Sequence, residues 1–211
     1  YFNLPKILTH ILHSEKIFNM TRLLLILILT LSFQNLTRAD DIRDFEIEGM
    51  SIGDSLLDYF SEKKIIKNKL NYNYGKKGFY ASGFYKESFY ETYDSVEIHL
   101  KDNDKNYIIY SLDGLIFYDE DIKKCHKKQN EIKIELLKTF ENSKMIDSGI
   151  QELNADKSGN STLKTYYWRL NAGNIVGLEC YNWSDKIVEE SSWKDNLRIS
   201  LVKKEFNDWL P

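Results

Sequence analysis

The segment from Thr162 to Trp183 carries the strongest secondary-structure pattern in this chain. Apolar side chains alternate with polar ones in both of its halves, which is the period of two that half-buried β-strands show. Between the halves, Asn171-Ala172-Gly173 suits a three-residue turn with glycine in the left-handed position. We therefore predict a β-hairpin.

The loop length sets the register of this hairpin. A three-residue loop places Trp168 opposite Val176 and Tyr166 opposite Leu178, so the apolar residues of both strands share one face. A two-residue turn would put them on opposite faces. The pattern therefore predicts the register as well as the hairpin.

Other alternating stretches predict further antiparallel strands. Residues 40–48 indicate a short strand or extended lead-in, and residues 96–100, 106–112, 115–118 and 197–201 indicate strands. Asp113-Gly114 is a frequent turn pair and is expected to separate the third of these stretches from the fourth. The polar segments 146–159 and 184–195 are expected to be connections, and Phe206, Trp209 and Leu210 to close the chain as an apolar clamp.

One long helix is predicted from Asp119 to about Glu141, because apolar residues recur there at helical spacing over several turns. Two shorter helices are expected earlier. The first follows a Ser51–Asp54 capping box and the second begins at Ser61-Glu62. We therefore predict an α+β domain over residues 40–211, with an antiparallel sheet of about five or six strands, the long helix packed on one face and short N-terminal helices.

The N-terminal region has the three parts of a secretory signal. Met20-Thr-Arg is positively charged, residues 23–33 are apolar, and Thr37-Arg38-Ala39 offers small residues for cleavage. The apolar run is 11 residues long, against the ~20 that a membrane-spanning helix needs. We expect residues 1–19 to be an upstream extension, residues 20–39 a signal peptide, and the mature protein to be exported to the periplasm or outside the cell.

Export gives a role to the two cysteines, Cys125 and Cys180. In an oxidising compartment a single pair is expected to form a disulfide, and this one would tie the long helix to the hairpin. Closing a loop of this size would stabilise the fold by about 4 kcal/mol on the chain-entropy model. The alternative is two buried thiols that pack as small hydrophobic groups.

The charge of the chain excludes one functional class. Its net charge is −3, and beyond residue 39 the 25 basic residues face 31 acidic ones. A nucleic-acid-binding protein would show a concentrated positive surface. We therefore expect no nucleic acid among its partners, and contact with a membrane only through the signal segment before cleavage.

Residues 79–93 contain three Phe-Tyr doublets spaced five residues apart. In a strand this spacing puts aromatic rings on both faces, which fits a strand covered on both sides or a loop that wraps the core. A second interpretation is a stacking surface for a sugar or another flat ligand. The candidate residues for that aromatic ligand face are Tyr80, Phe84, Tyr85 and Tyr90.

Two overlapping serine motifs raise the question of catalysis. Gly49-Met-Ser51-Ile-Gly53 matches G-x-S-x-G, and Gly53-Asp-Ser55-Leu56 resembles the opening block of the GDSL esterases. Both chemistries need a histidine to accept the serine proton. His99 and His126 remain beyond the signal segment, neither follows in the required place, and helix capping explains the serines better. We predict no catalytic residues and no enzyme activity.

The sequence predicts no metal or cofactor site. The two histidines have no ligand spacing, and Asp102-x-Asp104-x-Asn106 begins like a calcium loop but has Tyr107 where glycine is needed. The lysines around His126 could attract anionic lipid or peptidoglycan. They are more simply the solvated face of an amphipathic helix.

The run Ile47–Leu56, within residues 47–60, resembles two groups of proteins. One is the uncharacterised small exported proteins of bacteria. The other is the start of the BamE and β-lactamase-inhibitor-protein-like modules, whose first helix follows a Gly-Met-Ser/Thr cap. The chain lacks the lipid-bearing cysteine of the lipoproteins, and no functional residue transfers. The resemblance implies a non-enzymatic envelope protein that acts through its surface.

These observations predict an exported binding or assembly module of the cell envelope, whose partner is another envelope protein. Binding of a small ligand or glycan by the aromatic rings of Phe79–Tyr93 is the alternative, and a serine esterase at Ser51 or Ser55 is a third hypothesis.

Overall fold

A computed structural model of the chain describes residues 42–72, 74–119, 121–154, 156–191 and 193–211. The chain divides into two units between residues 38 and 39, and everything described below lies in the second unit. The predicted upstream extension at 1–19 and signal peptide at 20–39 lie outside the described residues.

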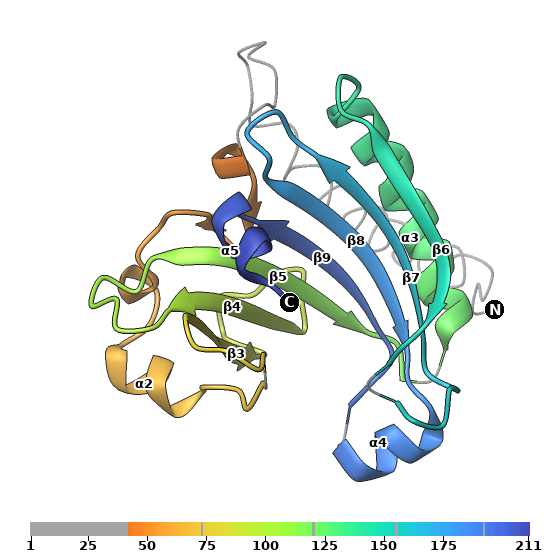
Figure 1. Cartoon of the computed structure of the whole chain (residues 1–211), viewed down its shortest axis with the longest axis horizontal. Helices are drawn as coiled ribbons and strands as arrows, with labels where there is room; N and C mark the ends of the chain where they lie inside the picture. The colour runs from red at the N-terminus through yellow and green to blue at the C-terminus, as the bar shows by residue number, and fades with distance from the viewer. Residues whose placement is uncertain (1–41, 73, 120, 155, 192) are drawn as a thin grey trace, which may run out of the picture. The chain divides into compact units, whose positions relative to one another are not determined.

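The centre of the fold is a seven-stranded antiparallel sheet in the order β3-β4-β5-β9-β8-β7-β6 (Figure 1). A separate two-stranded ribbon, β1 paired with β2, precedes it. The strands are β1 Glu46–Ile47, β2 Met50–Ser51, β3 Phe79–Tyr85, β4 Ser95–Lys101, β5 Ile109–Phe117, β6 Met145–Glu152, β7 Thr162–Arg169, β8 Ile175–Asn182 and β9 Asn196–Val202.

Helix α3 is the long helix that the sequence predicted, and it begins at a cap in which the Asp121 carboxylate accepts from the Lys124 amide. None of the described helices is long and apolar enough to cross a bilayer. The predicted α+β class is confirmed, but the sheet has seven strands rather than the five or six predicted. The helices are the short 3₁₀ turns η1 Ile42–Asp44 and η2 Leu56–Asp58, and α2 Glu62–Lys67, α3 Ile122–Thr139, α4 Asp185–Ser191 and α5 Lys204–Trp209.

The predicted hairpin is confirmed in its register. Strands β7 and β8 place Trp168 opposite Val176 and Tyr166 opposite Leu178. Gly173 adopts a φ of +79°, the left-handed conformation that glycine enters without a Cβ clash. The hydrophobic pattern fixed this register because a one-residue slip would expose Trp168, which is fully buried.

The two faces of the sheet have different roles. One face carries the apolar positions of every central strand, and α3 packs on it over β8 and β9. A disulfide joins Cys125 of α3 to Cys180 of β8, and both residues are buried in this core. The opposite face, which we call the polar face, carries the alternate residues, and α5 lies on that side (Figure 1).

The predicted turn at Asp113-Gly114 is wrong, because both residues lie inside the continuous strand β5. The glycine serves packing rather than a turn. The ring of Tyr93 lies directly over Gly114, and a Cβ on this residue would stand 2.6 Å from two ring carbons. Tyr93 is held in place by its backbone amide, which donates to the Glu48 carboxylate at 2.7 Å.

Replacing Gly114 with alanine is expected to lower the free energy of unfolding by about 1–3 kcal/mol, because the buried Tyr93 ring must move. Gly177→Ala in β8 is the matched control, since its nearest neighbour would be Ser200 Cβ at 3.4 Å. Urea unfolding measures both variants. Equal losses at the two positions would show that the Tyr93 contact is not the cause.

Three further predictions need correction. Residues 146–159 are not only a connection, because β6 forms the edge of the sheet through pairing with β7. The segment 184–195 contains helix α4. Only half of the predicted capping box at Ser51 forms, because the Ser51 amide donates to Asp54 Oδ2 at 2.9 Å whereas the Ser51 hydroxyl donates to the Phe45 carbonyl. Ser51 lies in β2, and the helix expected after it is only the short η2 turn. Strand pairing of Ser51 with Glu46 overrides the local helix signal.

Candidate functional site

Strand alternation places four charged residues together on the polar face. Glu97 of β4 is paired with Asp113 of β5, and Arg198 of β9 is paired with Glu179 of β8. The residues that flank them along the strands are on the core side of the sheet, and all but Gly114 have apolar side chains. The polar face is therefore built from the same strands that form the core, which holds these side chains on rigid supports.

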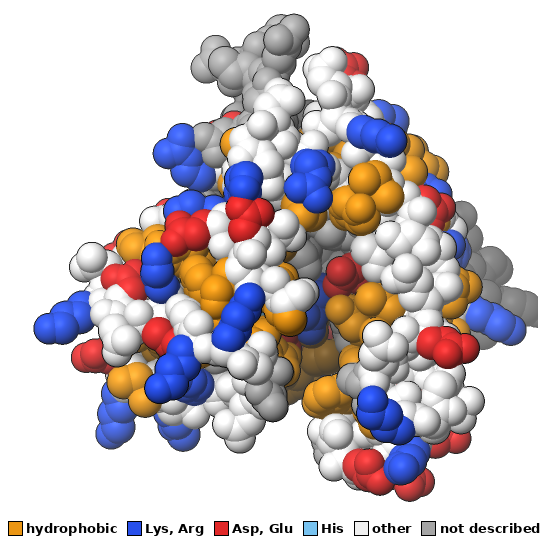
Figure 2. All heavy atoms as spheres, in the orientation of Figure 1, with side chains coloured by type: hydrophobic (Ala, Val, Ile, Leu, Met, Phe, Trp, Pro, Cys, Tyr) orange, Lys and Arg blue, Asp and Glu red, His pale blue; other side chains and the backbone are white. Residues whose placement is uncertain are grey.

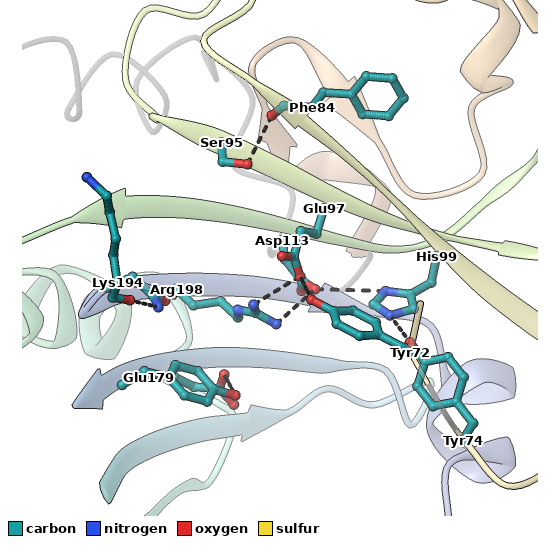
Figure 3. A network of polar contacts seen from close by, with 12 residues as sticks. Tyr72, Tyr74, Phe84, Ser95, Glu97, His99, Asp113, Glu179, Lys194 and Arg198 are labelled. Atoms are coloured by element: carbon teal, nitrogen blue, oxygen red, sulfur yellow. Dashed lines mark hydrogen bonds and ion pairs between the residues drawn. The ribbon is translucent and has the colours of Figure 1, made fainter. Parts of the chain in front are cut away.

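Arg198 is the centre of a buried ionic network (Figure 3). Its Nη2 donates to Glu97 Oε2 at 3.0 Å, and its Nη1 lies 3.7 Å from Asp113 Oδ2. Only 18% of the Arg198 side chain is exposed. The Tyr72 hydroxyl donates to the same Glu97 oxygen at 2.9 Å, so this carboxylate accepts from two sides.

The carboxylates outnumber the cation in this network. Asp113 approaches Arg198 alongside Glu97, while Glu179 accepts a hydrogen bond from the Tyr181 hydroxyl at 3.1 Å. Burial raises the pKa of both Asp113 and Glu179, and Arg198 opposes this rise in each case. The polar face is therefore rich in acidic groups that are costly to ionise.

His99 of β4 lies beside this network and is buried rather than solvated. Its Nε2 is 2.7 Å from the Tyr74 hydroxyl, and its ring centroid is 4.5 Å from that of Phe206 in α5. Burial lowers the pKa of the imidazole to about 4, with Glu97 acting in the opposite direction and Arg198 in the same direction. His99 is therefore neutral at pH 7, although its Nδ1 lies 3.8 Å from Asp113 Oδ2.

We expect the neutral His99 to make the protein less stable in acid. Because the folded pKa of about 4 lies below the ordinary 6.5, the unfolded chain binds more protons between these values. Stability conferred by His99 is thus present above pH 6.5 and falls by up to about 3 kcal/mol as the pH drops to 4.

An NMR titration of the imidazole and urea unfolding of His99→Gln against pH measure this effect. Glutamine keeps an amide for the Tyr74 hydroxyl and does not titrate. The free energy of unfolding of the variant should therefore rise relative to that of the wild type as the pH falls. Comparison with the wild type removes the opposite contributions of Asp113 and Glu179, whose pKa values are raised. An imidazole that titrates near 6.5 would contradict the prediction.

An aromatic pocket of about 420 Å³ opens on the polar face at the end of the sheet near α4. Trp183 follows β8 and Trp193 precedes β9, and their ring centroids are 4.5 Å apart. The amide of Trp183 donates to Asp195 Oδ1 at 2.8 Å, which ties the two ends of the β8–β9 connection together. The lining residues are Tyr72, Tyr85, Glu97, Leu115, Phe117, Tyr181, Trp183, Trp193, Lys194, Asn196 and Arg198.

The rings of this pocket form a row that ends at the ionic network. Tyr181 stacks on Trp183 at a centroid distance of 5.4 Å. The Arg198 guanidinium lies over the Tyr181 ring, 5.2 Å from its centroid. At the rim, Lys194 forms an ion pair with Asp119 at 2.7 Å. The pocket thus combines flat apolar surfaces with charged groups that are already paired within the protein.

A second pocket of about 420 Å³ adjoins the first on the same face, and both are lined by Arg198 and Tyr181. Its character is different, since its walls carry several hydroxyl groups and two carboxyl groups among apolar side chains. We call it the hydroxyl pocket, after Ser111, Thr165, Tyr167 and Ser200, which line it with Asp113 and Glu179. Figure 2 looks onto this face and shows a hollow with charged groups at its bottom and hydrophobic side chains on its walls.

The structure separates the four aromatic residues that the sequence grouped as a ligand face. Tyr85 lies in the aromatic pocket and is 55% exposed. Phe84 points to the opposite face, where it is buried and stacks on Phe60 at 3.9 Å. Tyr80 lies under the Lys69 ammonium in another depression, and Tyr90 packs against Phe89 beyond the end of β3. They therefore do not form one surface.

The two candidate serines are engaged in local hydrogen bonds. The Ser51 hydroxyl donates to the Phe45 carbonyl at 3.1 Å, and the Ser55 hydroxyl donates to the Asn106 carbonyl at 2.7 Å. Ser55 Oγ also accepts from the Leu57 amide and caps η2. These contacts account for both serines structurally.

The resemblance to a calcium loop has a similar explanation. The Asp104 carboxylate accepts from the amides of Asn106 and Ile108, and Asp102 accepts from the Gly78 amide at 2.8 Å. Within the described parts of the chain, no group of three or more histidine, cysteine, aspartate or glutamate residues is arranged to hold a metal ion. The acidic side chains of this loop therefore order the backbone.

Sequence reasoning missed the residues that make the site: Arg198, Glu179, Glu97 and the Trp183–Trp193 pair. A signal was present. Each of the three charged residues interrupts a strand-like run of apolar residues, such as Leu197-Arg198-Ile199. This pattern also describes an ordinary solvated face, so it does not by itself reveal a pocket.

No protein-family model, curated protein or solved structure matches this chain. The resemblance of residues 47–60 to the BamE-like modules therefore stays a prediction, and functional inference depends on the geometry of the polar face.

Proposed function

We propose that this chain is an exported binding protein that holds a small, ring-containing polar ligand in the aromatic pocket. The main support is the row formed by Trp193, Trp183 and Tyr181, which leads directly to the Arg198–Glu97 ion pair. Small-molecule sites characteristically combine apolar and aromatic walls with a few fixed polar groups, and volumes of about 300–1,000 Å³ are usual.

The exposure of the rings also supports a binding role. Trp193 is 41% exposed and Tyr85 is 55% exposed, although large aromatic side chains contribute most to stability when they are buried. Both line the same pocket. A ligand that covered them would recover the apolar contact that the free protein leaves in water.

The buried Cys125–Cys180 disulfide is compatible with export, because such bonds persist in oxidising compartments. The proposal involves no chemical step on the ligand. It extends the hypothesis of an aromatic ligand face, but moves that face from Phe79–Tyr93 to the β8–β9 connection, with Tyr85 shared by the two.

Trp193→Ala is expected to weaken ligand binding by about ten-fold or more, since exposed tryptophans that are buried on binding are typical energetic centres of interfaces. Tryptophan fluorescence and thermal shift across a library of ring-containing compounds and glycans would identify the ligand. Phe89→Ala is the matched control, because Phe89 is 42% exposed and does not line the aromatic pocket. Equal binding by wild type and Trp193→Ala for every compound that binds would overturn the proposal.

Recruitment of another envelope protein is a second candidate function. It is favoured by β6, which forms one edge of the sheet and carries Ile150 with 64% of its surface exposed. An edge strand can accept an additional strand from a partner. This partner stays a prediction.

A further inference from the structure

The aromatic pocket and the hydroxyl pocket are two parts of one elongated site. They lie on the same face of the sheet, have equal volumes of about 420 Å³, and share Arg198 and Tyr181 as lining residues. Arg198 pairs with Glu179 and Tyr181 pairs with Asn196, so the boundary between the pockets follows two neighbouring paired positions of β8 and β9. A ligand larger than one ring can therefore extend from one pocket into the other along the strands.

The charges around Arg198, where the two pockets meet, disfavour an anionic ligand. Arg198 is the buried cation there, and Glu97 and Asp113 already approach this guanidinium, while Glu179 adds a third carboxyl group. A phosphate or carboxylate placed here would be repelled by these acidic groups, and Arg198, the cation that could attract it, already interacts with them. Lys194 at the rim is paired with Asp119.

The polar groups suit a ligand that both donates and accepts hydrogen bonds. The hydroxyl pocket presents Ser111, Thr165, Tyr167 and Ser200 beside carboxyl groups that can accept. Two residues that line the aromatic pocket carry buried polar atoms that make no hydrogen bond to the described residues, Nε of Arg198 and Oδ1 of Asn196. A donor and an acceptor near the rings match hydroxyl groups, each of which can donate and accept.

We infer that the ligand is an uncharged carbohydrate of two or more linked sugar rings. One sugar ring stacks against Trp183 and Trp193. The carbohydrate then passes over Arg198, so that its next ring lies in the hydroxyl pocket beside Asp113 and Glu179. This inference rests on the proposed binding function and adds the ligand class, its length and its direction along the strands.

The test uses neutral glucose, cellobiose and cellotriose, with the corresponding N-acetylglucosamine and maltose series, in calorimetric titration of the disulfide-bonded protein. In at least one series, the two-ring sugar is expected to bind about ten-fold more tightly than the single ring. Trp193→Ala is expected to lose binding of every length. Affinity that does not change with length in any series would overturn the inference.

Gly177→Val tests the second pocket alone. Gly177 lines the hydroxyl pocket and not the aromatic pocket, and a β-branched side chain there would project into the space for the second ring. We expect the advantage of the longer sugars to disappear while single-ring binding is retained. Thr165→Val, which removes one hydroxyl and keeps the side-chain shape, is a second variant should Gly177→Val fail to fold, and it should reduce the same advantage.

The outcomes separate the two levels of the proposal. If no sugar binds but another ring compound does, and Trp193→Ala abolishes that binding, the carbohydrate inference fails and the binding function stands. If a charged amine or a phosphate compound binds more tightly than every neutral sugar, the inferred ligand class is wrong. If the length advantage survives in both Gly177→Val and Thr165→Val, the inferred path through the hydroxyl pocket is wrong.

Discussion

Replacing Cys125 and Cys180 together with alanine is expected to lower the free energy of unfolding by about 4 kcal/mol. The disulfide closes a loop of 55 positions between α3 and β8, and removing it returns that loop entropy to the unfolded chain. Both residues are buried, so alanine avoids placing a new hydroxyl in the core. Because domains of this size are stable by only about 5–15 kcal/mol, this loss is a large share of the total.

Urea unfolding with and without a reductant measures the effect of the disulfide. The wild type should lose stability when reduced, and the double alanine variant should not respond. Mass spectrometry of the native protein after alkylation provides an independent check. Free thiols at Cys125 and Cys180 would contradict both the bond and the proposed export to an oxidising compartment. A double variant as stable as the wild type would contradict the expected contribution of the bond to stability.

Replacing Arg198 with methionine is expected to cost about 3–5 kcal/mol at pH 7, the usual cost of removing one partner from a buried ionic network. Methionine keeps much of the apolar volume, so the loss reports the charge. Glu97 and Asp113 are paired across β4 and β5, and both side chains are largely shielded from solvent. Without the Arg198 guanidinium, these two carboxyl groups would lose the cation that they both approach.

The pH dependence of Arg198→Met separates charge from packing. Without Arg198, the pKa of Asp113 and Glu179 should rise further above their ordinary values, because Arg198 now opposes that rise. A raised folded pKa favours the folded protein at low pH, and that benefit is lost as pH increases. The difference in free energy of unfolding between the variant and the wild type should therefore be smaller at pH 5 than at pH 8.

Arg169→Met on β7 is the matched control. Arg169 is exposed, so the same substitution should change stability by no more than about 0.5 kcal/mol. Unfolding in urea at three pH values measures both variants. A loss at Arg198 that is independent of pH would show that packing, and not the ionic network, is the cause.

Local pattern was sufficient where one side of an element is buried by the core. The β7–β8 register followed from the apolar alternation of Tyr166 and Trp168 against Leu178 and Val176. Helix α3 followed from its apolar stripe, and the pairing of Cys125 with Cys180 followed from the expectation of an oxidising compartment. In the hairpin and the helix, burial on one side leaves a periodic trace in the sequence.

The same reasoning failed where the conformation of a residue depends on contacts with segments that are distant in the sequence. Asp113-Gly114 is a frequent turn pair, but here Tyr93 from a distant segment packs on the glycine and Arg198 from β9 approaches the aspartate. Strand β6 was missed because an exposed edge strand can be largely polar, and its pairing with β7 is what makes it a strand.

The sequence by itself therefore determined an antiparallel sheet with an apolar face, the long helix on that face and the disulfide that joins them. Only the tertiary structure decided what the other face does. The alternation of polar and apolar residues indicates that the sheet has a polar face. The residues of a solvated face and those of a buried binding site recur with the same period of two, so alternation does not distinguish them. The distinction comes from residues far apart in the chain, Tyr72 and Tyr74 before β3, Phe206 in α5 and Trp193 before β9, which enclose the charges of the central strands.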